Sequence, residues 1–118
     1  MLGPERRRSK RLSLDVPLVV RGEAEDTRAF QEGTLTLDVS AHGALVVLGT
    51  KVALGQKLEL MNLKNWLERE GAVARVAPHF GGFTRVGIEF AQPAPEFWSI
   101  SERPQDWSLS SRHSFDPQ

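Results

Sequence analysis

Residues 33–48 read GTLTLDVSAHGALVVL, and this stretch decides the expected fold. Two short apolar segments, residues 33–40 and 43–48, stand on either side of a tight turn. In the first segment apolar and polar side chains alternate, which is the period of a half-buried strand. Gly43 permits a sharp turn or a close backbone approach, so that the second strand begins at once. The stretch therefore predicts a β-hairpin.

The alternation assigns each side chain of the first strand to a face. Its apolar residues are expected to point inward and its polar residues outward. Asp38 and Ser40, two positions apart, should therefore share the outer surface and be able to contact one ligand. The residues expected to face inward are Leu35, Leu37 and Val39; Thr36 is expected to face outward with Asp38 and Ser40.

Short apolar segments separated by turn residues continue along the chain. The expected strands are residues 14–22, 33–40, 43–48, 57–60, 72–77 and 84–90. Without a long amphipathic helix, this pattern predicts a mainly all-β fold, a six-stranded antiparallel β-barrel whose closure removes unpaired edges. Residues 62–70 are expected to form a loop or one helical turn. A short C-terminal segment with Phe97 and Trp98 is expected to pack on one end of the barrel.

The 118 residues fit one domain with additional segments at both ends. Residues 1–12 are expected to be a flexible basic arm, residues 13–100 the barrel domain, and residues 101–118 a poorly ordered tail. The formal net charge is zero, but residues 5–11 hold five basic side chains and one acidic one, which leaves ten basic and fourteen acidic elsewhere. The arm is thus expected to bind an anion, or to rest on its own acidic body.

Several function classes are disfavoured by composition. The chain has no cysteine, and its three histidines lack carboxylates at ligand spacing, so no metal or other cofactor is expected. Ser40 and His42 are too close in sequence to form a nucleophile with an oriented base, so a catalytic role is not expected. No signal peptide and no apolar run of roughly 18 residues is present. A soluble cytoplasmic protein without a membrane span is the expectation.

Two motifs resemble the signature of a known family. Arg6-Arg7-x-x-x-Arg11 followed by Asp38-x-Ser40-x-x-Gly43 is similar to the two-part motif of the PilZ domain, whose members bind the bacterial second messenger cyclic di-GMP. Residues 86–90 and the Phe97-Trp98 pair also resemble this family, and the resemblance extends from residue 5 to about 98. It implies a non-enzymatic receptor that binds cyclic di-GMP through Arg6, Arg7, Arg11, Asp38, Ser40 and Gly43.

The residue types suit this ligand. Arginine forks bind phosphate oxygens and the O6/N7 edge of guanine in a bidentate way. A carboxylate such as Asp38 accepts hydrogen bonds from the N1/N2 edge, Ser40 donates or accepts, and Gly43 gives access to the backbone. Arg8 is a further candidate. So is Arg75, whose guanidinium would stack on guanine.

Other readings remain open from sequence alone. A small β-barrel that binds single-stranded nucleic acid through its basic arm is one, although the strands lack interleaved aromatic residues, which makes nucleic acid an unfavoured partner. A PilZ-like adaptor that binds only protein is another. In the family the arm becomes ordered when ligand binds, which implies an unidentified downstream protein partner and either a monomer or a ligand-dependent dimer.

Overall fold

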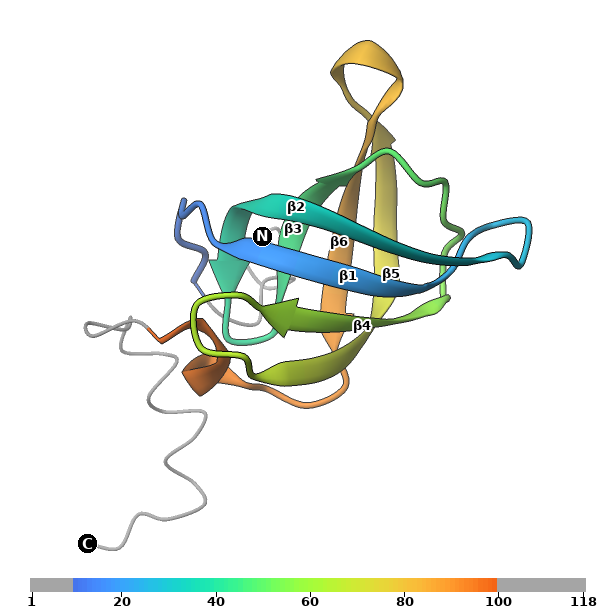
Figure 1. Ribbon diagram of the computed structural model, residues 1–118. Coiled ribbons are helices and arrows are strands. Elements are labelled where there is room, and N and C mark those ends of the chain that lie inside the picture. The colour runs from blue at the N-terminus through green and yellow to red at the C-terminus, as the bar shows by residue number, and fades with distance from the viewer. Residues whose placement is uncertain (1–9, 100–118) are drawn as a thin grey trace, which may run out of the picture.

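The computed structural model describes residues 10–99, and within them six antiparallel strands form a closed barrel (Figure 1). The order around the barrel is β1-β2-β3-β6-β5-β4. The strands are β1 (Pro17–Glu23), β2 (Ala29–Ser40), β3 (Gly43–Leu48), β4 (Lys57–Asn62), β5 (Glu68–Pro78) and β6 (Thr84–Phe90). The predicted all-β barrel is confirmed. The expected tail, residues 101–118, lies outside the described residues, as do residues 1–9 of the expected arm.

Strand pairing extends two strands beyond their apolar segments. β2 begins at Ala29 because its first residues pair with β1 as far as Glu23. β5 begins at Glu68, inside the predicted loop, because its first residues pair with β4. Residues 29–32 contain one large apolar side chain, Phe30, and residues 68–70 contain none, so only the pairing with the neighbouring strand reveals these extensions.

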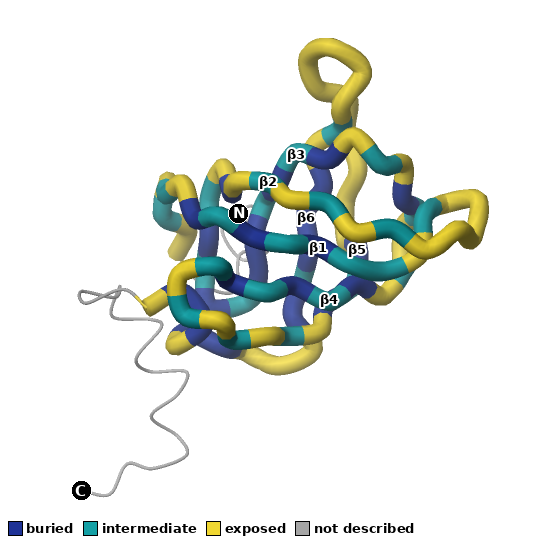
Figure 2. The backbone as a smooth tube through the Cα atoms, in the orientation of Figure 1, coloured by how far each residue is buried: buried dark blue, intermediate teal, exposed yellow. Residues whose placement is uncertain are grey.

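Aliphatic side chains fill the interior of the barrel, and the buried residues are dark blue in Figure 2. They alternate with outward-facing residues along the strands, as the strand period requires. The largest fully buried aliphatic residues are Leu18, Val20, Val39, Val46, Leu48, Leu58, Leu60 and Val86. This continuous core fixes which face of each strand is available to a ligand.

The short helix η3 (Pro95–Trp98) closes one end of the barrel, as predicted. Phe97 is fully buried, and its ring contacts Phe90 and Trp98 with centroids 5.3 and 4.8 Å away. The buried Asn62 amide donates to the carbonyl oxygen of Phe97 at 2.7 Å. An aromatic cluster and a buried hydrogen bond therefore hold this segment against the barrel.

A β-bulge in β2 corrects one sequence prediction. The pairing with β3 shifts between Thr36 and Asp38, so Leu37 is an extra residue in the strand. Leu35 and Leu37, expected to face inward, are 53% and 39% exposed, whereas Thr36 is fully buried. The Thr36 hydroxyl accepts a hydrogen bond from the Val16 N–H at 2.9 Å and donates to the carbonyl oxygen of Leu14. A threonine can therefore occupy the core because both hydrogen-bonding roles of its hydroxyl are satisfied.

The β5–β6 hairpin extends beyond the rest of the barrel (Figures 1 and 2). The pairing of β3 with β6 ends at Thr84, and that of β4 with β5 ends at Ala72. Every residue from 74 to 83 is exposed. The tip contains the single turn η2 (Phe80–Gly82).

Replacing Thr36 with valine should lower the free energy of unfolding by about 1 to 3 kcal/mol, because the Val16 N–H and Leu14 carbonyl lose their partner in the interior. Urea denaturation followed by circular dichroism measures this loss. Thr34→Val is the matched control, since the Thr34 hydroxyl donates to the carbonyl oxygens of Val47 and Leu35 at a position that is not buried. Equal losses in the two variants would contradict the role assigned to Thr36.

Candidate functional site

Asp38 and Ser40 lie at the end of β2 on its outer face. Val39, between them, is fully buried, so its two neighbours point away from the core. The bulge precedes Asp38 and therefore leaves this part of the predicted alternation intact. Within residues 10–99 the Asp38 carboxylate has no hydrogen-bond or ion-pair partner. It is thus a partly exposed anion available to a ligand.

The C-terminal end of the basic arm is attached at this point. Leu12 forms an isolated antiparallel bridge with Val39, in which the two residues exchange backbone hydrogen bonds of 2.8 and 2.9 Å. Leu12 also packs against the core. In this antiparallel register the exposed Arg11 comes opposite Ser40. One arginine of the first motif is therefore brought beside the second motif.

The turn from β2 to β3 is braced from several sides. The Ser40 hydroxyl oxygen accepts a hydrogen bond from the His42 N–H at 3.1 Å, a local serine turn. The Trp98 indole donates to the carbonyl oxygen of Ser40 at 2.8 Å. Backbone bonds join the Ala94 N–H to Ala41 and the Phe90 N–H to His42. The backbone that carries the motif is therefore fixed by η3 and by the end of β6.

Gly43 has a structural reason to be glycine. A Cβ atom at this position would lie 1.9 Å from the carbonyl oxygen of Ile88 on β6. No side chain fits in that space, so Gly43 lets β3 approach β6 closely. This requirement holds whether or not a ligand binds.

Four residues form a row across the outer face, which we call the outer row. Asp38 on β2 is opposite Leu45 on β3, Leu45 is opposite Gly87 on β6, and Gly87 is opposite Arg75 on β5. With strands about 4.8 Å apart, three strand spacings separate the Asp38 and Arg75 backbones by about 14 Å. A carboxylate and a guanidinium thus lie at the two ends of a largely apolar strip.

Arg75 lies over Gly87. The ideal Cβ position at Gly87 is 3.5 Å from Arg75 Nε and 3.6 Å from its Nη2, so the guanidinium occupies the space a side chain would take. Arg75 is exposed and makes no ion pair within the described residues. The Arg75 side chain is thus on the outer face of the barrel.

The structure therefore brings together five of the sequence-predicted site residues on one side of the barrel: Arg11, Asp38, Ser40, Gly43 and Arg75. The predicted residues Arg6, Arg7 and Arg8 lie outside the described residues. Sequence reasoning missed Leu45, Gly87 and the bracing role of Trp98. Only the register of β3, β6 and η3 identifies them, and no motif in the sequence does.

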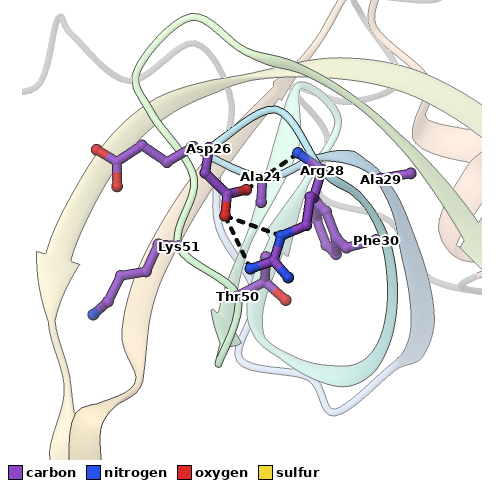
Figure 3. A pocket seen from close by; sticks show the side chains of 8 residues that line it. Ala24, Asp26, Arg28, Ala29, Phe30, Thr50 and Lys51 are labelled. Atoms are coloured by element: carbon purple, nitrogen blue, oxygen red, sulfur yellow. Dashed lines mark hydrogen bonds and ion pairs between the residues drawn. The ribbon is translucent and has the colours of Figure 1, made fainter.

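A separate pocket of about 460 Å³ lies at the opposite end of β2 (Figure 3). Figure 3 shows the Arg28 guanidinium turned toward Asp26, with Nε and Nη2 3.1 and 2.9 Å from Oδ2. Hydrogen bonds from the Arg28 backbone and side chain hold the pKa of the Asp26 carboxyl below its ordinary value. None of the sequence-predicted site residues lines this pocket, and its arginine is already ion-paired.

Residues 10–99 contain no cluster of three or more acidic or histidine side chains able to hold a metal ion. In the same part of the chain no helix has the length and apolar character needed to cross a membrane.

Comparison with known proteins places the chain in a family. The sequence model of the PilZ domain matches residues 5–98, which is most of the chain. The chain belongs to the PilZ domain family. This PilZ chain has no significant match in a search of curated protein sequences.

Solved structures share the PilZ fold. The Bacillus subtilis inhibitor of motility MotI/DgrA is 19% identical with a TM-score of 0.62, over 95% of this chain and 53% of that one. Escherichia coli YcgR in complex with c-di-GMP is 17% identical with a TM-score of 0.53, over 94% and 45%. The PilZ domain of YcgR with c-di-GMP is 16% identical with a TM-score of 0.54, over 94% and 90%. The chain thus spans about half the length of the first two proteins.

Replacing Gly43 with alanine should reduce the free energy of unfolding by about 3 kcal/mol or more, because the new Cβ would overlap the Ile88 carbonyl and push β3 away from β6. Thermal and urea unfolding measure the effect. Gly33→Ala is the matched control, since the nearest atom to a Cβ there is 4.0 Å away. A Gly43→Ala protein as stable as the control would mean that the close approach is not required.

Proposed function

We propose that this chain is a non-enzymatic receptor for cyclic di-GMP. Membership of the PilZ family supports the ligand class, and two of the similar structures contain c-di-GMP. The observation that carries the proposal is the bridge between Leu12 and Val39, which attaches the basic arm beside Asp38 and Ser40. The arginine motif and the Asp-x-Ser-x-x-Gly motif then act as one site.

Each residue has a distinct task in the proposed site. The Asp38 carboxylate accepts hydrogen bonds from the N1 and N2 groups of guanine, for which it has no competing partner within the described residues. The Ser40 oxygen already accepts from His42, and its hydroxyl hydrogen is left to donate to the ligand. Arg6, Arg7 and Arg11 bind phosphate oxygens and the O6/N7 edge with their forked donors.

The outer row extends the proposed site beyond the two motifs. Leu45 and Gly87 form a floor without charge between Asp38 and Arg75. Arg75, which lies over Gly87, provides a guanidinium group on which a guanine can stack. The outer row has a hydrogen-bond acceptor, Asp38, at one end and a cation, Arg75, at the other. These groups match a ligand that contains two guanines and two phosphodiesters.

Binding would also order the arm. Fixing arm residues costs about 1 to 2 kcal/mol of backbone entropy each, and charge-assisted hydrogen bonds to the ligand offset this at about 1.5 to 3 kcal/mol each. The balance is compatible with a dissociation constant near micromolar, about −8 kcal/mol. An arm that becomes ordered gives a downstream protein a surface to recognise.

Isothermal titration with cyclic di-GMP tests the proposal, with GTP and a short single-stranded oligonucleotide as controls. Saturable binding near micromolar for the cyclic dinucleotide alone would support a receptor. Binding of the oligonucleotide alone would favour the nucleic-acid alternative. If none of the three ligands gave a heat of binding, an adaptor that binds only protein would be favoured.

Asp38→Ala and Arg7→Ala should each weaken cyclic di-GMP binding at least tenfold, because each removes a charged hydrogen-bonding group from the site. The melting temperature of the free protein should stay nearly constant, since the Asp38 carboxylate has no partner within residues 10–99. Glu70→Ala, at an exposed position of β5, is a control of similar charge. Unchanged affinity in either variant would remove that residue from the site.

Affinity for cyclic di-GMP should fall as salt rises, because the ligand carries two phosphodiesters and the arm carries the opposing cations. Titrations from 50 to 500 mM sodium chloride test this expectation. The slope should be smaller than for a duplex DNA binder, since fewer phosphates are contacted. A flat response would argue against phosphate contacts by the arm.

A further inference from the structure

The tip of the β5–β6 hairpin exposes more apolar surface than folding requires. Phe80 is 84% exposed, Phe83 46% and Val76 40%, and none of them belongs to the buried core. Phe80 projects from the turn η2 into solvent, whereas the ring of Phe83 also lies beside Gly49, with Cε1 3.2 Å from the ideal Cβ position there. Large apolar side chains grouped on a projecting element indicate a contact surface.

The charge of the hairpin has one sign. Between Ala72 and Ile88 the sequence contains two arginines and one histidine but no acidic residue. Arg85 leans toward the tip, with Nε 3.4 Å from Nδ1 of His79, the residue directly before Phe80. Arg75, by contrast, lies back over Gly87. One cation, the Arg85 guanidinium, and the histidine that accepts its hydrogen bond therefore lie immediately behind the aromatic tip.

We propose that this hairpin tip inserts into the surface of a membrane that contains anionic lipids. Phe80 and Phe83 would enter the interfacial layer, where aromatic rings are favoured, and Arg85 and His79 would meet the phosphate groups. The tip projects from the barrel (Figure 1), a shape that a deformable lipid surface accepts without a matching pocket.

The size of the tip favours lipid over a protein partner. Two phenylalanines bury about 300 to 500 Å², whereas each partner in a standard protein complex contributes about 800 Å². A small apolar insertion with a few cations gives weak, reversible membrane binding. The membrane contact uses none of the residues proposed to bind cyclic di-GMP, although Arg75 and Gly87 of the outer row lie on the same hairpin.

The test is co-sedimentation of the whole chain with vesicles of equal phosphatidylglycerol and phosphatidylcholine in low salt. The wild-type chain should pellet with these vesicles and much less with phosphatidylcholine alone. Phe80→Ala combined with Phe83→Ala should lower the pelleted fraction at least fivefold, and Arg85→Glu at least threefold. Leu54→Ala and Lys64→Glu are matched controls at exposed positions outside the hairpin and should pellet like wild type.

A label on the tip provides a second readout. The chain has no cysteine, so Phe83→Cys accepts one nitrobenzoxadiazole fluorophore beside an intact Phe80. Its emission should shift to the blue on anionic vesicles, whereas the same label in Leu54→Cys should not respond. Circular dichroism checks that each variant is folded.

Two results would overturn the proposal. Equal pelleting of wild type and the double phenylalanine variant would assign membrane binding to another segment, such as the basic arm. If the wild-type chain did not pellet with the vesicles, the exposed tip would instead be assigned to contact with a protein partner. Titration with cyclic di-GMP separates the two proposals, because the double phenylalanine variant should keep the affinity of wild type whether or not it binds vesicles.

Discussion

The close approach of β3 to β6 at Gly43 is the constraint on which the proposed site depends. It leaves no room for a Cβ atom beside the Ile88 carbonyl, and it lies at the end of the β3–β6 pairing. The same pairing sets Leu45 against Gly87, and thereby aligns Asp38 with Arg75 across four strands. A packing requirement inside the barrel thus fixes the spacing of charged groups on its surface.

The sequence predicted the fold because the six apolar segments are separate and each has a clear period. It failed at Leu35, Leu37 and Thr36, since alternation assumes an uninterrupted strand and a bulge shifts the phase by one residue. The predicted outward orientation of Asp38 and Ser40 agrees with the structure because both residues follow the bulge. Such errors in the assignment of inward and outward residues are confined to the strand before the bulge. They can be found only from the pairing of that strand with its neighbour.

The candidate site was predictable in its motifs but not in its surroundings. Asp38 and Ser40 belong to a short pattern that resembles a motif of the PilZ family. Leu45, Gly87 and Trp98 contribute through register and through the position of η3, both of which depend on contacts distant in sequence. A residue that joins a site only because folding places it there cannot be recognised from a motif in a single sequence.

The isolated β-bridge between Leu12 and Val39 affects how strongly the proposed site can bind its ligand. It holds the root of the arm at the site, and five residues of chain can carry Arg7 no farther than about 17 Å from Leu12. In the proposed receptor, capture of a bound ligand by the arm would therefore be an intramolecular event, with an effective concentration in the millimolar range typical of short tethers. A separate peptide with the arm sequence would need a millimolar concentration in solution to bind the ligand to the same extent.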